Sequence, residues 1–295
     1  MSEHTSNYYV PEQSKWPIIA SIGLFVTVIG AANFIQQHTG IVKNEGSLGP
    51  YLLGAGILIL IYMIFGWFND TIKESMAGLN SKQLDVSYRM GMMWFIFSEV
   101  MFFAAFFGAL FYTRLLGVPW LGGEGSNAMT HEVLWPNFQA MWPLVQTPDG
   151  RTFHAMGPWP LPFINTLLLI TSGIFLTIAH HGLKTNHRNT VIVTLATSIL
   201  LGLTFLVVQA YEYYHAYHEL GLTLNAGIYG STFFLLTGFH GLHVTIGVIL
   251  LTTMWLRVIK GHFSPENNFA FEAAAWYWHF VDVVWIFLFF VVYWL

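Results

Sequence analysis

Seven apolar stretches, each about as long as a membrane-spanning helix, constrain this chain more than any other feature of its sequence. A helix needs roughly 20 mostly apolar residues to cross the hydrocarbon core of a bilayer. Strands of a transmembrane barrel would instead alternate apolar and polar residues over about ten positions, and residues 54–68 show no such alternation. The sequence therefore predicts an all-α polytopic membrane protein with seven transmembrane helices. They are expected at Trp16–Gln36, Pro50–Phe68, Met90–Leu116, Pro160–Gly182, Asn189–Ala210, Ile228–Val258 and Ala274–Leu295.

The composition supports this prediction and excludes several kinds of protein. Of the 295 residues, 55% are hydrophobic and 9% are charged, whereas a soluble domain averages about 25% charged residues. The sequence has no cysteine, which excludes Cys-ligated iron–sulfur clusters, covalently attached c-type haem and Cys nucleophiles. Its 11 basic residues against 15 acidic ones give no electrostatic footprint for nucleic acid.

The distribution of Lys and Arg predicts the orientation, because cytoplasmic segments are enriched in basic residues. With the N-terminus inside, eight basic residues fall in inner segments and three in outer ones. The inner eight are Lys15, Lys73, Lys82, Arg89, Lys184, Arg188, Arg257 and Lys260, and the outer three are Lys43, Arg114 and Arg151. We expect a polar cytoplasmic tail at 1–15, without signal-peptide features, and one seven-helix membrane domain at 16–295. The C-terminus would lie outside, as would a long loop at 117–159.

Ionisable side chains inside the predicted spans are candidates for function, because placing them in hydrocarbon is costly. Glu99, His240, His243 and Asp282 lie near one depth, and His279 lies about one turn nearer the inside. His240 and His243 share a helix face, as do His279 and Asp282, since each pair is three residues apart. This spacing is compatible with a metal or proton site. A buried polar network that locks helix to helix is the more frequent arrangement.

The remaining histidine pairs argue against a di-iron site of the membrane hydroxylase kind. His180 and His181 end the fourth span on the inside, whereas His215 and His218 follow the fifth span on the outside. A hydrocarbon core of about 30 Å separates these pairs, while metal ligands lie about 2 Å from their ion. A haem held by two facing histidines stays open, because spacing alone allows it.

Aromatic and basic residues are mixed at the inner ends of the second and sixth spans. Trp67, Lys73 and Glu74 lie around the end of the second span, and Arg257 and His262 around the end of the sixth. Such residues usually anchor helix ends in the membrane interface. The same groups suit an anionic phospholipid, with cations on the phosphate and apolar walls along the tails.

Several longer motifs resemble one known family. Residues 227–243 (GIYGSTFFLLTGFHGLH) and 271–285 (FEAAAWYWHFVDVVW) are similar to the last two helices of subunit III of cytochrome c oxidase, in the haem–copper oxidase family. Shorter stretches extend the resemblance in order along nearly the whole chain. They are residues 98–103 (SEVMFF), 165–166 (NT), 179–181 (AHH) and 209–214 (QAYEYY).

The resemblance implies a fold, a complex and a set of roles. The family has a two-helix and a five-helix bundle, separated by a lipid-filled cleft. Haem and copper belong to subunits I and II, so this chain would be a non-catalytic subunit of a proton-translocating oxidoreductase, with no metal of its own. It would contact and stabilise subunit I, support proton uptake and carry Glu99 as a buried carboxylate. Phospholipids would bind at Trp67, Lys73, Glu74, Arg257 and His262.

Two departures and two alternatives accompany the resemblance. Asn69 stands where the family pattern leads us to expect a basic residue before Asp70. The loop at 117–159 is longer than in mitochondrial relatives, which points to a bacterial inner membrane. A quinol oxidase subunit III is the nearest alternative, although it typically begins at what is the third span here. An independent transporter or haem protein is the more remote one, and an optical spectrum with the co-purifying partners would distinguish it.

Overall fold

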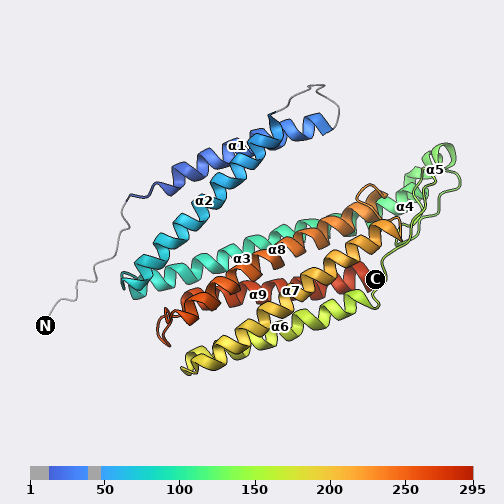
Figure 1. Ribbon diagram of the computed structural model, residues 1–295. Helices are drawn as coiled ribbons and strands as arrows, with labels where there is room; N and C mark the ends of the chain where they lie inside the picture. The colour runs from blue at the N-terminus through green and yellow to red at the C-terminus, as the bar shows by residue number, and fades with distance from the viewer. Residues whose placement is uncertain (1–12, 39–47, 295) are drawn as a thin grey trace. The chain divides into compact units, whose positions relative to one another are not determined.

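The computed structural model describes residues 13–38 and 48–294 (Figure 1), and among them seven helices are long and apolar enough to cross a membrane. The predicted number and order of spans are therefore confirmed. Most of the predicted tail at 1–15, Lys43 in the first of the predicted outer loops, and Leu295 lie outside the described residues. The long helices are α1 (Trp16–His38), α2 (Gly49–Met76), α3 (Lys82–Tyr112), α6 (Leu161–Lys184), α7 (Arg188–His218), α8 (Gly227–Ile259) and α9 (Phe269–Leu288). Shorter elements are η1 (Thr113–Gly117), α4 (Val118–Leu121), η2 (Gly125–Asn127), α5 (Ala128–Leu134) and η3 (Phe289–Trp294).

Several helices run well past the predicted spans. α2 continues from Phe68 to Met76, and α7 continues from Ala210 to His218. Hydropathy marks only the part of a helix that lies in hydrocarbon, whereas the backbone hydrogen bonds continue into the polar interface. α2 ends where Gly78 takes a positive φ of 71°, a conformation that glycine adopts without steric cost.

The described residues divide into two compact units, one before and one after the boundary between Tyr88 and Arg89. α1 packs along α2 in the first unit. The indole Nε1 of Trp16 donates a hydrogen bond of 2.9 Å to Asp70 Oδ2, and its ring meets Tyr62 edge-on at 5.8 Å. These contacts fix the beginning of α1 against the end of α2.

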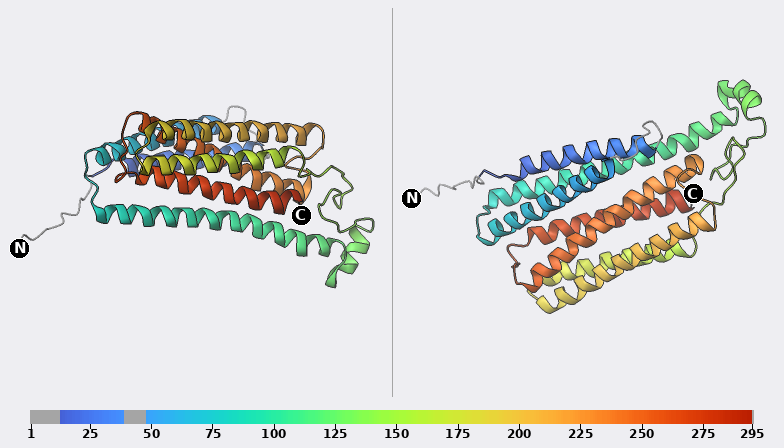
Figure 2. Two further views of the ribbon diagram at one scale, coloured as in Figure 1. Left: turned by 90° about the horizontal axis from the view of Figure 1, so that it is seen from below. Right: turned by 45° about the horizontal axis from the view of Figure 1, so that its top comes forward.

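In the second unit, α6, α7, α8 and α9 run alongside one another (Figure 2) around the fully buried Trp278. A Cβ added at Gly202 or Gly247 would lie 2.6 or 2.7 Å from the indole ring, so only glycine admits it. Trp278 Nε1 donates a hydrogen bond to Ser172 Oγ at 3.1 Å, and the Ser172 and Ser198 hydroxyls are hydrogen-bonded at 2.9 Å. Small and hydroxyl-bearing residues therefore bring these helices together, as is usual in membranes.

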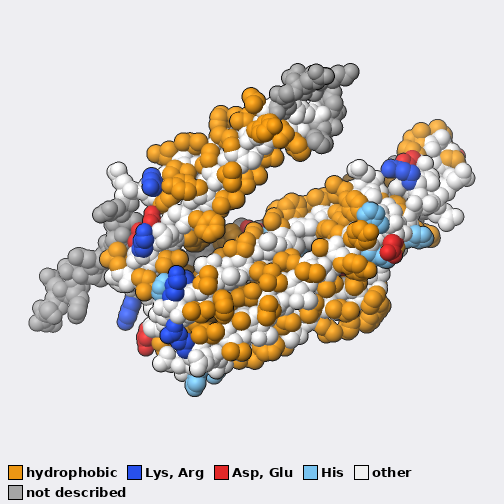
Figure 3. All heavy atoms as spheres, in the orientation of Figure 1, with side chains coloured by type: hydrophobic (Ala, Val, Ile, Leu, Met, Phe, Trp, Pro, Cys, Tyr) orange, Lys and Arg blue, Asp and Glu red, His pale blue; other side chains and the backbone are white. Residues whose placement is uncertain are grey.

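The outer surface of this unit is apolar along the helices (Figure 3). Val193, Leu200 and Val207 recur every seven residues on α7 and are 64%, 63% and 69% exposed. An exposed apolar stripe of this kind is stable against lipid tails, whereas its exposure to water would be energetically unfavourable.

The long loop at 117–159 is held to the helix ends by polar contacts. Arg151 Nη1 donates to Asn225 O at 3.1 Å, and its Nε pairs with Asp149 at 2.8 Å. The Thr147 hydroxyl also donates to Asp149, and this bond, with the help of Arg151, lowers the pKa of the Asp149 carboxyl below its ordinary value. A charged carboxylate is thus part of the folded turn.

Candidate functional site

Glu99 and His243 form a direct polar contact between α3 and α8. Glu99 Oε2 lies 2.8 Å from His243 Nε2, and the two side chains are 21% and 10% exposed. Phe103 covers the imidazole edge-on at 5.0 Å. The sequence placed both residues at one depth, and the structure brings them together.

The second nitrogen of His243 limits where the protons can be. His243 Nδ1 lies 2.6 Å from the carbonyl oxygen of Phe239, which only accepts hydrogen bonds, so Nδ1 must carry a proton and donate it. A hydrogen bond across the other contact then requires one further proton, held on either Glu99 Oε2 or His243 Nε2. The pair is therefore a neutral acid facing a neutral imidazole, or a carboxylate facing an imidazolium.

His240 makes a separate contact. Its Nε2 lies 3.1 Å from the carbonyl oxygen of Val281, to which it donates, and the residue is 1% exposed. Its ring packs between Phe205 and Trp285, at 5.7 and 5.0 Å. His240 thus joins α8 to the backbone of α9.

His279 and Asp282 face α6 rather than α8. His279 Nδ1 lies 3.5 Å from Asp282 Oδ2, and its Nε2 lies 3.4 Å from Thr177 Oγ1. The five midplane residues therefore occupy three contacts between different helix pairs. Within residues 13–38 and 48–294, no three His, Asp or Glu side chains are grouped to hold a metal ion.

The residues predicted to bind lipid fall on both units, each described by itself. In the first unit, Trp67 is 52% exposed, and Lys73 Nζ lies 3.8 Å from Asp70 Oδ1. In the second unit, Arg257 is 7% exposed and places its guanidinium 4.4 Å from the centre of the Phe263 ring. Burial, Arg257 and Lys260 lower the pKa of His262 below its ordinary value. An anion near these cations would oppose that shift.

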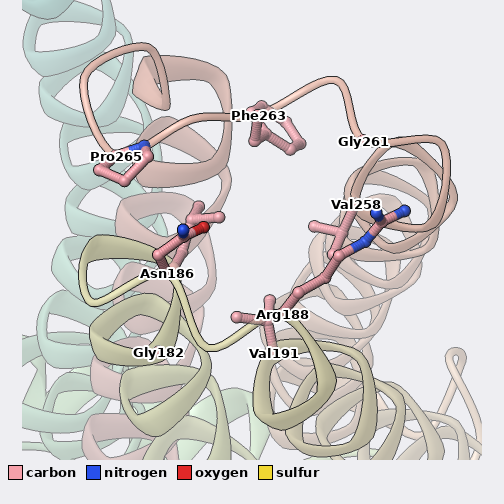
Figure 4. Close-up of a pocket in the computed structure, with 9 residues that line it drawn as sticks. Gly182, Asn186, Arg188, Val191, Val258, Gly261, Phe263 and Pro265 are labelled. Atoms are coloured by element: carbon pink, nitrogen blue, oxygen red, sulfur yellow. The ribbon is translucent and has the colours of Figure 1, made fainter.

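A cavity of about 160 Å³ lies at the junction of α6, α7 and the segment after α8 (Figure 4). Arg188, at the start of α7, extends toward Gly261, and its Nη2 donates to the carbonyl oxygen of Ile259. Arg188 therefore caps the C-terminus of α8, where a cation is favoured. The other lining residues are Gly182, Leu183, Asn186, Val191, Val258, Phe263 and Pro265.

The sequence interpretation missed a buried carboxylate contact. Glu212 is fully buried and accepts a hydrogen bond of 2.6 Å from the Tyr293 hydroxyl. Gln209, one turn earlier on α7, is 5% exposed. The predicted fifth span ended at Ala210, which put Glu212 outside the membrane, although the QAYEYY motif contains both residues. A second missed contact is the ion pair of Arg89 with Glu272, at 2.6 Å.

Comparisons with known proteins agree along the whole chain. The family model described as Cytochrome c oxidase subunit III matches residues 6–295. Cytochrome c oxidase subunit 3 of Arabidopsis thaliana is 38% identical, over 98% of this chain and 96% of that protein. The human protein of that name is 38% identical, over 100% of this chain and 99% of the human protein. A probable cytochrome c oxidase subunit 3 of Rickettsia conorii is 38% identical, over 97% of this chain and 92% of the bacterial protein.

Proposed function

Because this chain belongs to the cytochrome c oxidase subunit III family, we propose that it is the accessory membrane subunit of a respiratory oxidase. The family match over residues 6–295 is the observation that carries this proposal. The complex would reduce oxygen and pump protons, with haem and copper on partner subunits. Seven apolar helices and a bacterial relative fit a multi-pass inner-membrane protein. We propose a cytoplasmic N-terminus and a periplasmic C-terminus, on the distribution of Lys and Arg.

The chain's own residues support a structural role. Glu99, His240 and His243 are engaged in contacts between helices, and the same holds for Glu212 and Tyr293. Such contacts make the bundle rigid, and a rigid bundle can hold subunit I in the conformation that takes up protons. In this proposal, no residue of this chain forms a bond with a substrate or carries an electron.

Phospholipid binding is the second part of the proposal. Lys73 and Arg257 both end helices on the predicted inner side, so both can reach the same layer of lipid phosphates. Each such cation contributes about 1 kcal/mol near an anionic surface, and a phosphate hydrogen bond adds to this. Trp67, Glu74 and His262 would complete the lipid contacts.

The lipid proposal is tested with the double variant Lys73→Ala, Arg257→Ala. We expect less phospholipid per purified complex and faster inactivation during turnover. The matched control is Lys82→Ala, Lys184→Ala, which removes two other inner-side charges. Lipid content that is equal in the variant, the control and the unchanged complex would contradict the proposal.

The functional proposal is tested by purification in mild detergent, followed by mass determination of the co-purifying subunits and lipids. We expect stoichiometric association with a haem–copper subunit. Oxidation of reduced cytochrome c by the purified complex separates this proposal from the quinol oxidase alternative, which requires a quinol. A chain that purifies alone would refute the proposal.

A further inference from the structure

Three buried side chains with unused hydrogen-bonding groups lie in the second unit, toward the end that carries η3. They are Asn165 on α6 and Gln209 and Glu212 on α7, which are 0%, 5% and 0% exposed. Neither polar side-chain atom of Asn165 or of Gln209 has a hydrogen-bond partner in the chain, and Glu212 Oε2 has none either. At no other residue that the structure describes are two buried side-chain polar atoms without a partner. The unpaired groups are therefore concentrated in one part of the bundle.

The hydrogen bond between the Ser172 and Ser198 hydroxyls shows how α6 and α7 are aligned. The two helices are antiparallel neighbours (Figure 2), so residues before Ser172 lie level with residues after Ser198. Asn165 is two turns before Ser172 and Gln209 is three turns after Ser198, which keeps both on the faces that the serines join. Their levels differ by about one turn, roughly 6 Å. Because side chains tilt toward the N-terminus of their own helix, Asn165 and Gln209 lean toward each other.

Tyr293 of η3 lies beside the two polar residues of α7. Its hydroxyl donates a hydrogen bond of 2.6 Å to Glu212 Oε1. The Gln209 amide lies near the same hydroxyl, although not in hydrogen-bonding geometry. Trp285 connects Tyr293 to α6, because its ring packs against Tyr293 at 6.0 Å and its indole nitrogen donates to Thr166, next to the unpaired asparagine, at 3.0 Å. The unpaired groups therefore face one small region between α6, α7, α9 and η3.

The side chains around this region are apolar and shield it from bulk solvent. Phe205 packs edge-on against Trp285 at 4.7 Å, and Phe233 packs edge-on against Tyr293 at 5.5 Å. The two phenylalanines are 0% and 1% exposed. Polar groups left unpaired in such surroundings are costly, and folded proteins pair most of their buried polar groups with protein or ordered water.

The mixture of donors and acceptors identifies the missing partner. A metal cation would bind the amide and carboxyl oxygens and leave the amide nitrogens of Asn165 and Gln209 unpaired, whereas water both donates and accepts. A buried water molecule typically makes about three hydrogen bonds to groups of this kind. We propose that Asn165, Gln209 and Glu212 bind a cluster of internal water molecules that bridges α6 and α7. The cluster takes the place, at the η3 end, of the direct hydrogen bond that Ser172 and Ser198 make.

A high-resolution cryo-electron microscopy map of the purified protein, with whichever subunits accompany it, tests the site directly. We expect water density within about 2.7–3.2 Å of Glu212 Oε2 and of the two amide groups. Direct hydrogen bonds among the three side chains, without density between them, would overturn the proposal. So would a density bound by oxygen atoms alone at about 2.3–2.6 Å, the distances of a cation such as Ca²⁺.

Hydroxyl-radical labelling tests the same site in solution, because radiolysis of a bound water molecule modifies the side chains beside it. We expect Tyr293 to be labelled although it is only 5% exposed. Gln209→Met keeps the length of the side chain and removes two polar partners of the water, so it should lower the labelling of Tyr293. Tyr229, 3% exposed, is the internal reference whose labelling should not change.

The matched control is Val207→Met, which places the same side chain on the exposed face of α7 and should leave the labelling of Tyr293 unchanged. An unlabelled Tyr293, or equal labelling in Gln209→Met and the unchanged protein, would refute the water cluster. The site lies within this chain, so these results do not depend on the proposed function: a chain that purifies alone can still hold the water.

Discussion

Replacing Glu99 by leucine should destabilise the contact between α3 and α8. The substitution keeps an apolar side chain of similar size but leaves His243 Nε2 without its partner at 2.8 Å. His243 cannot turn its ring to compensate, because Nδ1 is engaged with the Phe239 carbonyl oxygen at 2.6 Å. Water cannot easily replace the carboxyl group, since the imidazole is 10% exposed and lies near mid-membrane depth.

Two magnitudes bound the effect. A buried polar group left without a partner costs about 1–3 kcal/mol in soluble proteins. Hydrogen bonds between membrane helices average about 0.6 kcal/mol and reach about 1.7 kcal/mol. The Glu99–His243 contact is short and largely buried, so we expect a loss of about 1–2 kcal/mol for Glu99→Leu. Glu99→Gln should cost less than half of this, because its amide can donate to His243 Nε2.

The assay is the unfolding free energy of the purified complex in mixed micelles, measured for a double-mutant cycle. His243→Phe keeps the ring against Phe103 and removes both nitrogens. Since replacing both partners by apolar groups can be nearly neutral, we expect Glu99→Leu, His243→Phe to be less destabilised than the sum of the single variants. Strictly additive losses, or equal losses for Glu99→Leu and Glu99→Gln, would show that no hydrogen bond between Glu99 and His243 stabilises the contact of α3 with α8.

Two further predictions concern the end of the second unit that carries the 117–159 loop and η3. Tyr293→Phe removes the donor to the buried Glu212 carboxyl and should cost about 1–3 kcal/mol, measured as a lower melting temperature than that of the control Tyr211→Phe on the exposed face of α7. The pKa of the Asp149 carboxyl is lowered in the folded chain, so the ionised carboxylate stabilises the turn at residues 146–152. This stabilisation is complete above the ordinary carboxyl pKa of about 4 and is lost as the pH falls through the lowered pKa. Thr147→Val should move that loss to higher pH in an NMR titration, and Asp149→Asn should abolish it; identical titrations with and without the Thr147 hydroxyl would contradict this account.

The helices and their depth were predictable, because hydrocarbon thickness and hydropathy fix both. The depth of Glu99 and of His243 follows from counting residues between polar flanks. Which of them face each other was not predictable, since this depends on how each helix is rotated about its axis. The sequence interpretation treated five midplane residues as one network, and the structure shows them in three separate contacts.

Glu212 was missed for a different reason. Its motif is polar and aromatic, with one carboxylate and three tyrosines in residues 211–214, and therefore falls below the hydropathy of a span. The helix nevertheless continues past it, and the Tyr293 hydroxyl donates a hydrogen bond to one oxygen of the carboxyl group. Only the folded position of the last residues reveals that donor.

The residues predicted to bind lipid come from motifs of the sequence, and the structure adds only the surroundings of each side chain. Arg257 is buried against Phe263, and its role in lipid binding stays a prediction. The contribution of Lys73 belongs to the other unit and stays a prediction. The variants described above decide it.

We propose that this chain is an accessory subunit of an oxidase and carries no redox centre itself. The most direct test is to purify the complex in mild detergent, identify its subunits by mass, then dissociate this chain and record its visible spectrum and metal content. We expect stoichiometric association with haem- and copper-bearing subunits, and a separated chain without visible absorbance or stoichiometric metal. A chain that purifies without such partners, or that keeps haem absorbance or a bound metal after separation, would contradict it.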